Sequence, residues 1–331
     1  MRDHHQRRVR FQRAIIAATL CTAVVIEGGN FIERSAIAAA AESASLQALT
    51  NEFAYGRDYT FERMEATRAV NDTEDNSTIR LVTYVYRPVK NDRREVVLYS
   101  HGSTGGLSSS PREPSNFPQR PVIRFFVSRG YTLVAPLRRG RGDSTGTYIE
   151  ECSVYVGQCT TADQVALTER GLREALLDTN AVIDQLVLGR LVPSVSKIIV
   201  AGHSRGGFLS LMLAAERPAV AKGVINFAGG WLATTRNLSD AENQQRTEEQ
   251  TARVARAAKR VTVPTIWIYA VRDSLYQDRF PLALVTSWRN AGAHAEFVHV
   301  TEHSLPDGHT VPTDAALWGR QMDAFLRLIQ G

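Results

Sequence analysis

A serine between two glycines, at the junction of a predicted strand and a predicted helix, constrains this chain most. Residues 202–206 read Gly-His-Ser-Arg-Gly, with the mostly apolar residues 197–201 before them and the mostly apolar residues 208–215 after them. These flanks place the G-x-S-x-G pattern at a sharp strand-to-helix turn. The glycines leave room for that turn, and the helix N-terminus favours the negative charge of acyl transfer. We predict that Ser204 is a nucleophile; the alternative is a glycine-rich connection with a capping serine.

Strands alternate with helices along the rest of the chain, which shows no internal repeat and no low-complexity linker. This alternation predicts a mainly parallel, doubly wound sheet covered on both faces by helices. We therefore expect one α/β domain over residues 42–331. The polar residues 232–260 follow the strand after the serine turn, and they are either a lid over the site or an amphipathic surface helix. Strands are expected near residues 79–87, 95–99, 131–135, 223–227, 265–270 and 296–300, and helices over residues 162–188, 281–290 and from about 313.

The N-terminal residues 1–41 have the pattern of an export signal. Several arginines precede the apolar residues 14–26, and alanine-rich cleavage candidates follow at residues 36–41. Thirteen residues are too few to cross a bilayer, which takes about 20, so no stable membrane span is expected. We predict a cleaved signal and a periplasmic or secreted protein. An uncleaved anchor is the alternative, and the pair Arg7-Arg8 suggests twin-arginine export.

The formal net charge of +5 comes largely from this leader. Residues 1–41 hold six arginines and three acidic residues, and the rest of the chain carries 33 basic and 31 acidic side chains. Because basic and acidic side chains are nearly equal in number beyond the leader, the charge gives no reason to expect a nucleic-acid partner. The sequence also lacks a P-loop, a zinc motif and a dinucleotide fingerprint, so we predict no cofactor and no metal. These features leave the oligomeric state open.

Two cysteines remain beyond the leader, Cys152 and Cys159. A pair with six residues between its members, in an oxidising compartment, predicts a small loop-closing disulfide. Metal binding is the alternative, although no histidine lies near the pair.

A serine nucleophile needs a base to take its proton and an acid to orient that base, at the same edge of the sheet. Asp273 follows a predicted strand closely and is the expected acid, with Asp278 as the alternative. A turn or capping role is the other interpretation of Asp273. His309, just ahead of the last helix, is the expected base and is favoured over His303. The three candidates therefore stand along the chain in the order serine, aspartate, histidine.

From about residue 79 to its end, the chain resembles the α/β-hydrolase superfamily, nearest to the dienelactone-hydrolase and prolyl-oligopeptidase-like branches. The resemblance rests on the serine turn, the later acid and histidine, and a His-Gly pair after an early strand at residues 101–102. It implies an oxyanion hole formed by the backbone N–H groups of Ser103 and Arg205. Ser204 departs from dienelactone hydrolases proper, which use cysteine. No propeller-length domain precedes the matching region, in contrast to prolyl oligopeptidase proper.

The resemblance implies hydrolysis of a small-molecule carboxylic ester through an acyl-enzyme. A peptidase or amidase with the same machinery, acting on a peptide substrate, is the first alternative. A binding protein with an inactive site on the same fold is the second. The acyl and alcohol groups of the substrate are not predicted.

An arginine-rich loop follows the strand predicted at residues 131–135. It contains Arg138, Arg139 and Arg141, near the expected rim of the site. These side chains are candidates for attracting a carboxylate-bearing substrate. The alternative is a loop whose arginines pair with acidic neighbours.

Overall fold

A computed structural model describes residues 53–70, 78–103, 118–150 and 160–330. The predicted export signal and the predicted Cys152–Cys159 disulfide lie outside the described residues, and both stay predictions. Within the described part of the chain, no helix combines the length and the apolarity needed to span a bilayer.

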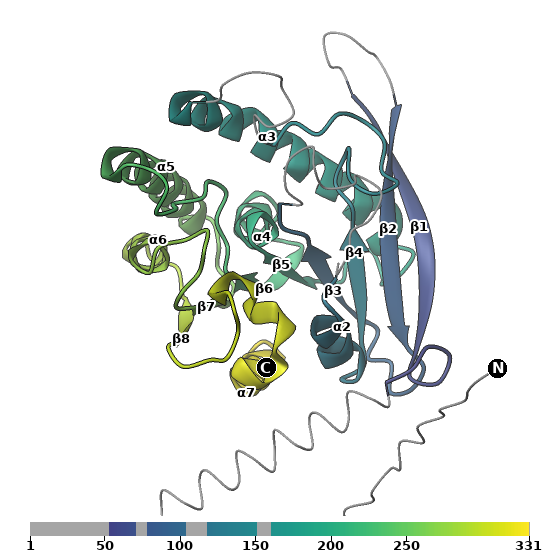
Figure 1. Cartoon of the computed structure of the whole chain (residues 1–331). Helices are drawn as coiled ribbons and strands as arrows, with labels where there is room; N and C mark the ends of the chain where they lie inside the picture. The colour runs from purple at the N-terminus through teal and green to yellow at the C-terminus, as the bar shows by residue number, and fades with distance from the viewer. Residues whose placement is uncertain (1–52, 71–77, 104–117, 151–159, 331) are drawn as a thin grey trace, which may run out of the picture. The chain divides into compact units, whose positions relative to one another are not determined.

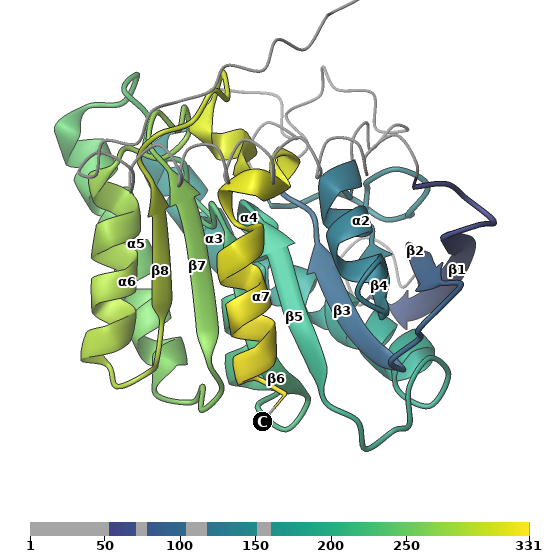
Figure 2. The ribbon, with the colours of Figure 1, turned by 90° about the horizontal axis from the view of Figure 1, so that it is seen from below.

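Eight strands form one sheet in the order β1-β2-β4-β3-β5-β6-β7-β8 (Figures 1 and 2). The six strands from β4 to β8 in this order run parallel, while β2 is antiparallel to both β1 and β4. The mainly parallel sheet predicted from the sequence is therefore present. The strands are β1 (Tyr59–Ala69), β2 (Thr78–Pro88), β3 (Glu95–Ser100), β4 (Tyr131–Pro136), β5 (Ile198–His203), β6 (Ala221–Phe227), β7 (Thr265–Ala270) and β8 (Glu296–Val300).

Helices cover both faces of this sheet, as Figures 1 and 2 show. Two helices, α2 and α7, lie on one face, and α3, α4, α5 and α6 lie on the other. Their bounds are α2 (Arg120–Val127), α3 (Thr161–Val182), α4 (Arg205–Glu216), α5 (Asp240–Ala258), α6 (Arg279–Asn290) and α7 (Gly319–Leu328). A short π-helix at Ile183–Val187 follows α3, and short 3-10 helices at Gly308–Thr313 and Ala315–Leu317 precede α7.

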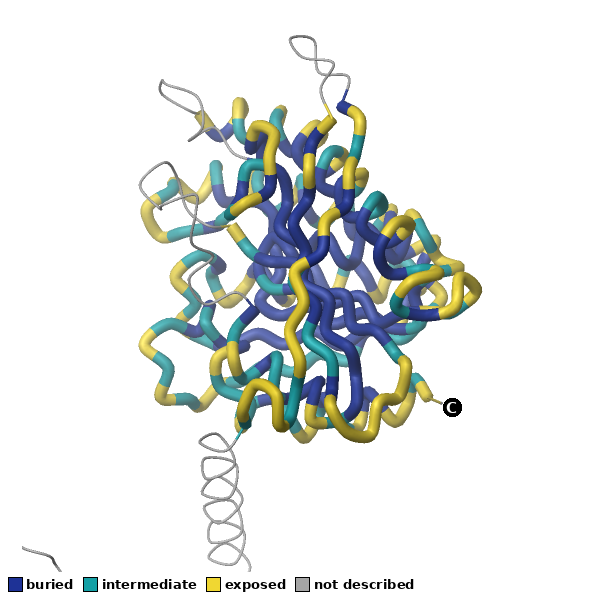
Figure 3. The backbone as a smooth tube through the Cα atoms, turned by 90° about the vertical axis from the view of Figure 1, so that its right-hand side faces the viewer, coloured by how far each residue is buried: buried dark blue, intermediate teal, exposed yellow. Residues whose placement is uncertain are grey.

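The core lies in the sheet and against its helices, where the central strands are buried along their length (Figure 3). All four tryptophans are fully buried. Trp318 packs against Phe125 of α2 and Phe227 of β6, with ring centroids 4.8 and 5.0 Å away. This contact fixes the chain just before α7 next to the end of β6, close to the serine turn.

Residues 232–260 contain α5, which packs against α4 and α6. Ser239 and Glu242 form a capping box at its N-terminus. The buried Gln250 accepts hydrogen bonds from the backbone N–H groups of Trp231 and Leu232 and donates one to the Leu232 carbonyl. These contacts fasten the helix to the domain, and the lid stays a prediction.

Candidate active site

The serine turn between β5 and α4 has a strained backbone. Ser204 has φ 56° and ψ −124°, a conformation that costs a residue with a side chain about 1–3 kcal/mol. Its N–H donates to the Phe227 carbonyl of β6 at 2.9 Å, and its side chain makes no capping hydrogen bond to α4. The strained turn therefore presents the hydroxyl without using it as a helix cap.

Both glycines of the pattern are required by close backbone contacts. A Cβ on Gly202 would lie 2.3 Å from the carbonyl carbon of Gly206. A Cβ on Gly206 would lie 2.0 Å from the Ser100 carbonyl oxygen at the end of β3. No side chain fits at either position, so the glycines let strand, turn and helix meet at this one point.

Asp273 and His309 form a buried pair in the turns after β7 and β8. His309 Nδ1 donates to Asp273 Oδ2 at 2.9 Å, and the two side chains are 11% and 2% exposed. The other carboxylate oxygen accepts from the backbone N–H groups of Leu275 and Tyr276. Because Nδ1 is occupied by the carboxylate, Nε2 of His309 is the nitrogen available to act as a base.

The alternative residues lie elsewhere. The ring of His303 is bonded to the Val271 carbonyl at 2.9 Å, and Arg272 donates to the His303 carbonyl. Asp278 is the N-terminal boundary residue of α6. The structure thus brings His309, and not His303, to Asp273.

Asp307, which sequence reasoning missed, ties the two turns together. One carboxylate oxygen accepts from the backbone N–H groups of Ser274 and His309 at 3.0 and 2.9 Å, and the other accepts from the Ser274 hydroxyl. Burial works to raise the pKa of Asp307, but these hydrogen bonds outweigh it and lower the pKa. The ionised carboxylate therefore positions the backbone of His309 relative to the turn that carries Asp273.

His203 provides a second support for His309. Its Nε2 donates to the His309 carbonyl at 2.8 Å, and the two rings are 4.8 Å apart. Gln119, held by the Tyr99 hydroxyl, lies 3.4 Å from the other ring nitrogen. Burial, and then the nearby His309, lower the pKa of His203 to about 3, so this ring stays neutral.

The His-Gly pair after β3 lies directly against the serine. A Cβ on Gly102 would fall 2.9 Å from the Cβ of Ser204, so the approach depends on glycine. His101 Nδ1 donates to the Gly102 carbonyl at 2.7 Å, while its Nε2 accepts from the backbone N–H of Arg138 at 3.1 Å. Burial, and then the charge of Arg138, lower the pKa of His101 to about 3. A neutral His101 thus supports the loop that leads to Ser103.

The three arginines after β4 are buried and engaged within the protein. Arg138 donates to the carbonyls of His101 and Gly102, at 2.6 and 3.2 Å, and forms a two-pronged ion pair with Glu150. Arg139 pairs with Asp178 and Glu174, and the guanidinium of Arg141 lies 3.4 Å from the centre of the Tyr148 ring. These contacts are those of the paired-loop alternative, so we do not assign the arginines to substrate binding.

Arg205, the residue after the serine, also has a buried side chain. It donates to the Trp231 carbonyl at 3.1 Å and to the Tyr148 hydroxyl at 2.8 Å. As the first residue of α4, it places its backbone N–H at the positive end of the helix dipole. The side chain of Arg205 is therefore engaged with Trp231 and Tyr148, while its backbone N–H lies at the start of α4.

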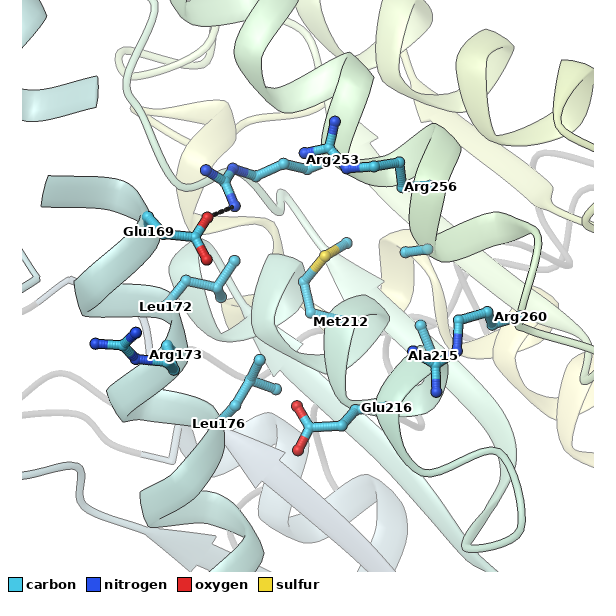
Figure 4. A pocket seen from close by; sticks show the side chains of 11 residues that line it. Glu169, Leu172, Arg173, Leu176, Met212, Ala215, Glu216, Arg253, Arg256 and Arg260 are labelled. Atoms are coloured by element: carbon cyan, nitrogen blue, oxygen red, sulfur yellow. Dashed lines mark hydrogen bonds and ion pairs between the residues drawn. The ribbon is translucent and has the colours of Figure 1, made fainter. Parts of the chain in front are cut away.

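One hollow of the described domain borders the expected acid, and a second lies apart from the serine turn. A polar hollow of about 1200 Å³ lies beside Asp273, between residues 234–240 and 272–279. A groove of about 350 Å³ lies between α3, α4 and α5, where Arg253 pairs with Glu169 above an apolar floor that includes Met212 (Figure 4). Met212 follows Ser204 by eight residues, about 12 Å along α4, so the groove is separate from the serine turn.

A parallel sheet with a sharp strand-to-helix turn after a central strand is the architecture of α/β-type hydrolases. Comparison with protein families gives the same class. The model of the "Alpha/beta hydrolase family" matches residues 96–329, which is more than half of the chain. The chain belongs to the alpha/beta hydrolase family, which confirms the predicted superfamily and fold class.

Solved structures show the same fold at low sequence identity. An esterase of Pyrococcus furiosus aligns with a TM-score of 0.55 at 16% identity over 82% of this chain and 92% of its own. A predicted dienelactone hydrolase of Klebsiella pneumoniae aligns with a TM-score of 0.50 at 15% identity, over 81% and 99%. An acylaminoacyl peptidase of Pyrococcus horikoshii aligns with a TM-score of 0.53 at 13% identity, over 86% of this chain and 43% of its own. No curated protein matches this sequence.

Proposed function

We propose that this protein is an exported serine hydrolase that cleaves carboxylic esters through an acyl-enzyme. The observation that carries the proposal is the buried Asp273–His309 pair, which lies at the same edge of the parallel sheet as the strained turn of Ser204. In this arrangement Ser204 Oγ attacks the ester carbonyl, and His309 Nε2 takes its proton and passes it to the leaving alcohol. Water then attacks the acyl carbon and gives its proton to His309 Nε2. The bond to Ser204 Oγ breaks, and His309 returns the proton to that oxygen.

The developing oxyanion would be held by the backbone N–H groups of Ser103 and Arg205, as the family resemblance implies. Two features of the structure support this assignment. Gly102 brings the loop before Ser103 against the serine, and Arg205 opens α4. Losing one such donor costs on the order of 100- to 1000-fold in rate.

An ester substrate is proposed ahead of an amide, on the fold that the chain shares with an esterase. An acylaminoacyl peptidase has that fold too, so the choice needs a direct assay. We expect turnover of short p-nitrophenyl esters. Cleavage of peptide anilides without any ester cleavage would instead assign the protein as a peptidase.

The decisive test is labelling with a fluorophosphonate probe. Wild-type protein should label and Ser204→Ala should not. Ser210→Ala is the matched control, because it removes a buried hydroxyl from the same helix that donates to the Gly206 carbonyl. Equal labelling of wild type and Ser204→Ala, or no labelling of either, would leave a binding protein with an inactive site. Export is tested separately, by fractionating cells that express the full chain with and without Arg7 and Arg8 replaced by lysine.

A further inference from the structure

Tyr276 lies beside all three members of the proposed triad. Its backbone N–H donates to Asp273 Oδ1 at 2.9 Å, and its ring lies 5.5 Å from the ring of His309. The Ser204 side chain neighbours the phenol and works to lower its pKa. Gly230 lies against both residues. Its N–H donates to the Ser204 carbonyl, and a Cβ on it would lie 2.7 Å from the Tyr276 oxygen.

The phenol is held firmly in this position. Tyr276 is 2% exposed, and its ring stacks on Phe280 with centroids 4.7 Å apart and an angle of 14° between the planes. Burial and the neighbouring Asp273 carboxylate raise the pKa of Tyr276, so the phenol keeps its proton at working pH. A protonated phenol beside a serine oxygen is a hydrogen-bond donor to that oxygen.

We propose that the Tyr276 hydroxyl donates a hydrogen bond to Ser204 Oγ and thereby speeds release of the acyl group from the serine. The inference rests on the proposed function, because it concerns the second half of the acyl-enzyme cycle. No proton leaves Tyr276. It acts on a reacting atom and is in this sense a further catalytic residue.

The two halves of the cycle use Ser204 Oγ in opposite ways. In acylation the oxygen is the nucleophile, and a donor on its lone pair does not help the attack. In deacylation water attacks the acyl carbon and gives its proton to His309 Nε2. The bond from the acyl carbon to Oγ then breaks, and Oγ gains negative charge until His309 returns that proton. A donor aimed at Oγ stabilises this leaving oxygen and therefore favours deacylation.

The test is Tyr276→Phe, which keeps the ring and removes the hydroxyl. We expect deacylation to slow about 10- to 100-fold, the effect of losing one hydrogen bond to a charged oxygen. Acylation should change less than about 3-fold. With p-nitrophenyl acetate the variant should then show a burst of p-nitrophenol approaching one per active site, followed by a slow steady rate. Its fluorophosphonate labelling rate should stay close to that of the wild type.

Tyr269→Phe is the matched control. It removes another buried tyrosine hydroxyl, one that donates to the Gly229 carbonyl and accepts from Asn226, and it should not separate the two steps. If Tyr276→Phe does not fold, Gly230→Ala serves instead, because the new Cβ displaces the phenol from Ser204.

The outcomes separate the inference from the function beneath it. Failure of wild-type protein to label would remove the proposed function itself. If wild type labels but the available variant slows both steps equally, the phenol acts on the oxyanion common to both steps, and the inference is wrong. It is also wrong if neither step changes, or if Tyr269→Phe produces the same burst.

Discussion

Removing the Arg138 guanidinium should both destabilise the fold and impair catalysis. Arg138 donates to the carbonyls of His101 and Gly102 and pairs with the buried carboxylate of Glu150. A trans peptide plane directs its C=O and its N–H to opposite sides. Holding the Gly102 carbonyl toward Arg138 therefore turns the N–H of Ser103, the proposed oxyanion donor, away from the arginine. Arg138→Met keeps the unbranched side chain and loses this hold.

The magnitude follows from Glu150. Burial alone would raise the pKa of this carboxyl, but the charge and hydrogen bonds of Arg138 outweigh burial and lower it from 4.5 to about 2. A fall of about 2.5 in pKa corresponds to about 3 kcal/mol of stability at neutral pH. Loss of one partner of a buried ion pair costs about 3–5 kcal/mol, which agrees. In the wild type this contribution is complete above pH 4.5 and is lost as the pH falls through about 2, because the folded-state pKa is the depressed one.

Urea unfolding and ester hydrolysis measure the two effects. Arg138→Met should lower the free energy of unfolding by about 3 kcal/mol and kcat/KM at least about 10-fold. Adding Glu150→Leu removes the stranded carboxylate, so the double variant should regain stability but not activity. A single variant that loses less than about 1 kcal/mol, or a double variant with restored kcat/KM, would refute the reasoning.

Three further predictions concern the same loops. Gly102→Ala places a Cβ 2.9 Å from Ser204 Cβ and should lower kcat/KM more than about 10-fold, with a smaller effect on the urea midpoint. Asp307→Ala frees the backbone of His309 and should lower kcat/KM about 10-fold, with partial recovery in Asp307→Asn, whose side-chain oxygen still accepts; equal loss in both variants would contradict this. His203 has a pKa of about 3 when folded, so the unfolded chain alone binds its proton between about pH 3 and 6.5, and stability rises with pH there. Urea unfolding of His203→Asn across this window should show a slope smaller by about 1.4 kcal/mol per pH unit, and an unchanged slope would contradict the assignment.

Most of the sheet is readable from the sequence, because buried parallel strands are short apolar runs. The predicted strands at residues 131–135 and 265–270 correspond to β4 and β7 almost residue for residue. Strand β1 was missed. It lies at the edge of the sheet, and within it only Met64 and Ala66 are buried, so its sequence carries charges instead of an apolar run. The helix predicted to reach residue 188 ends at Val182, and a short π-helix follows it from Ile183 to Val187.

The proposed triad can be anticipated from its sequence because each member stands between a predicted strand and the helix that follows it. Its supports cannot be anticipated in this way. Tyr276 looks like an ordinary aromatic residue after the acid, and His203 is the variable position of the serine pattern. Their roles depend on contacts with His309, 33 and 106 residues away along the chain. Such contacts exist only once β5, β7 and β8 lie in order in the sheet.

The arginine loop shows the same limit and points to a different role for its charges. Glu150 pairs with Arg138, which orients the peptide before Ser103, and it lies 3.9 Å from the guanidinium of Arg205. Tyr148 joins the set, donating to Glu150 and accepting from Arg205. The buried Glu150 carboxylate thus links two arginines. Arg138 orients the peptide before Ser103, the first proposed oxyanion donor, and Arg205 carries the second donor on its own backbone. Since two cations surround that carboxylate, replacing Glu150 alone should disturb both halves of the oxyanion hole, whereas replacing either arginine should disturb chiefly one.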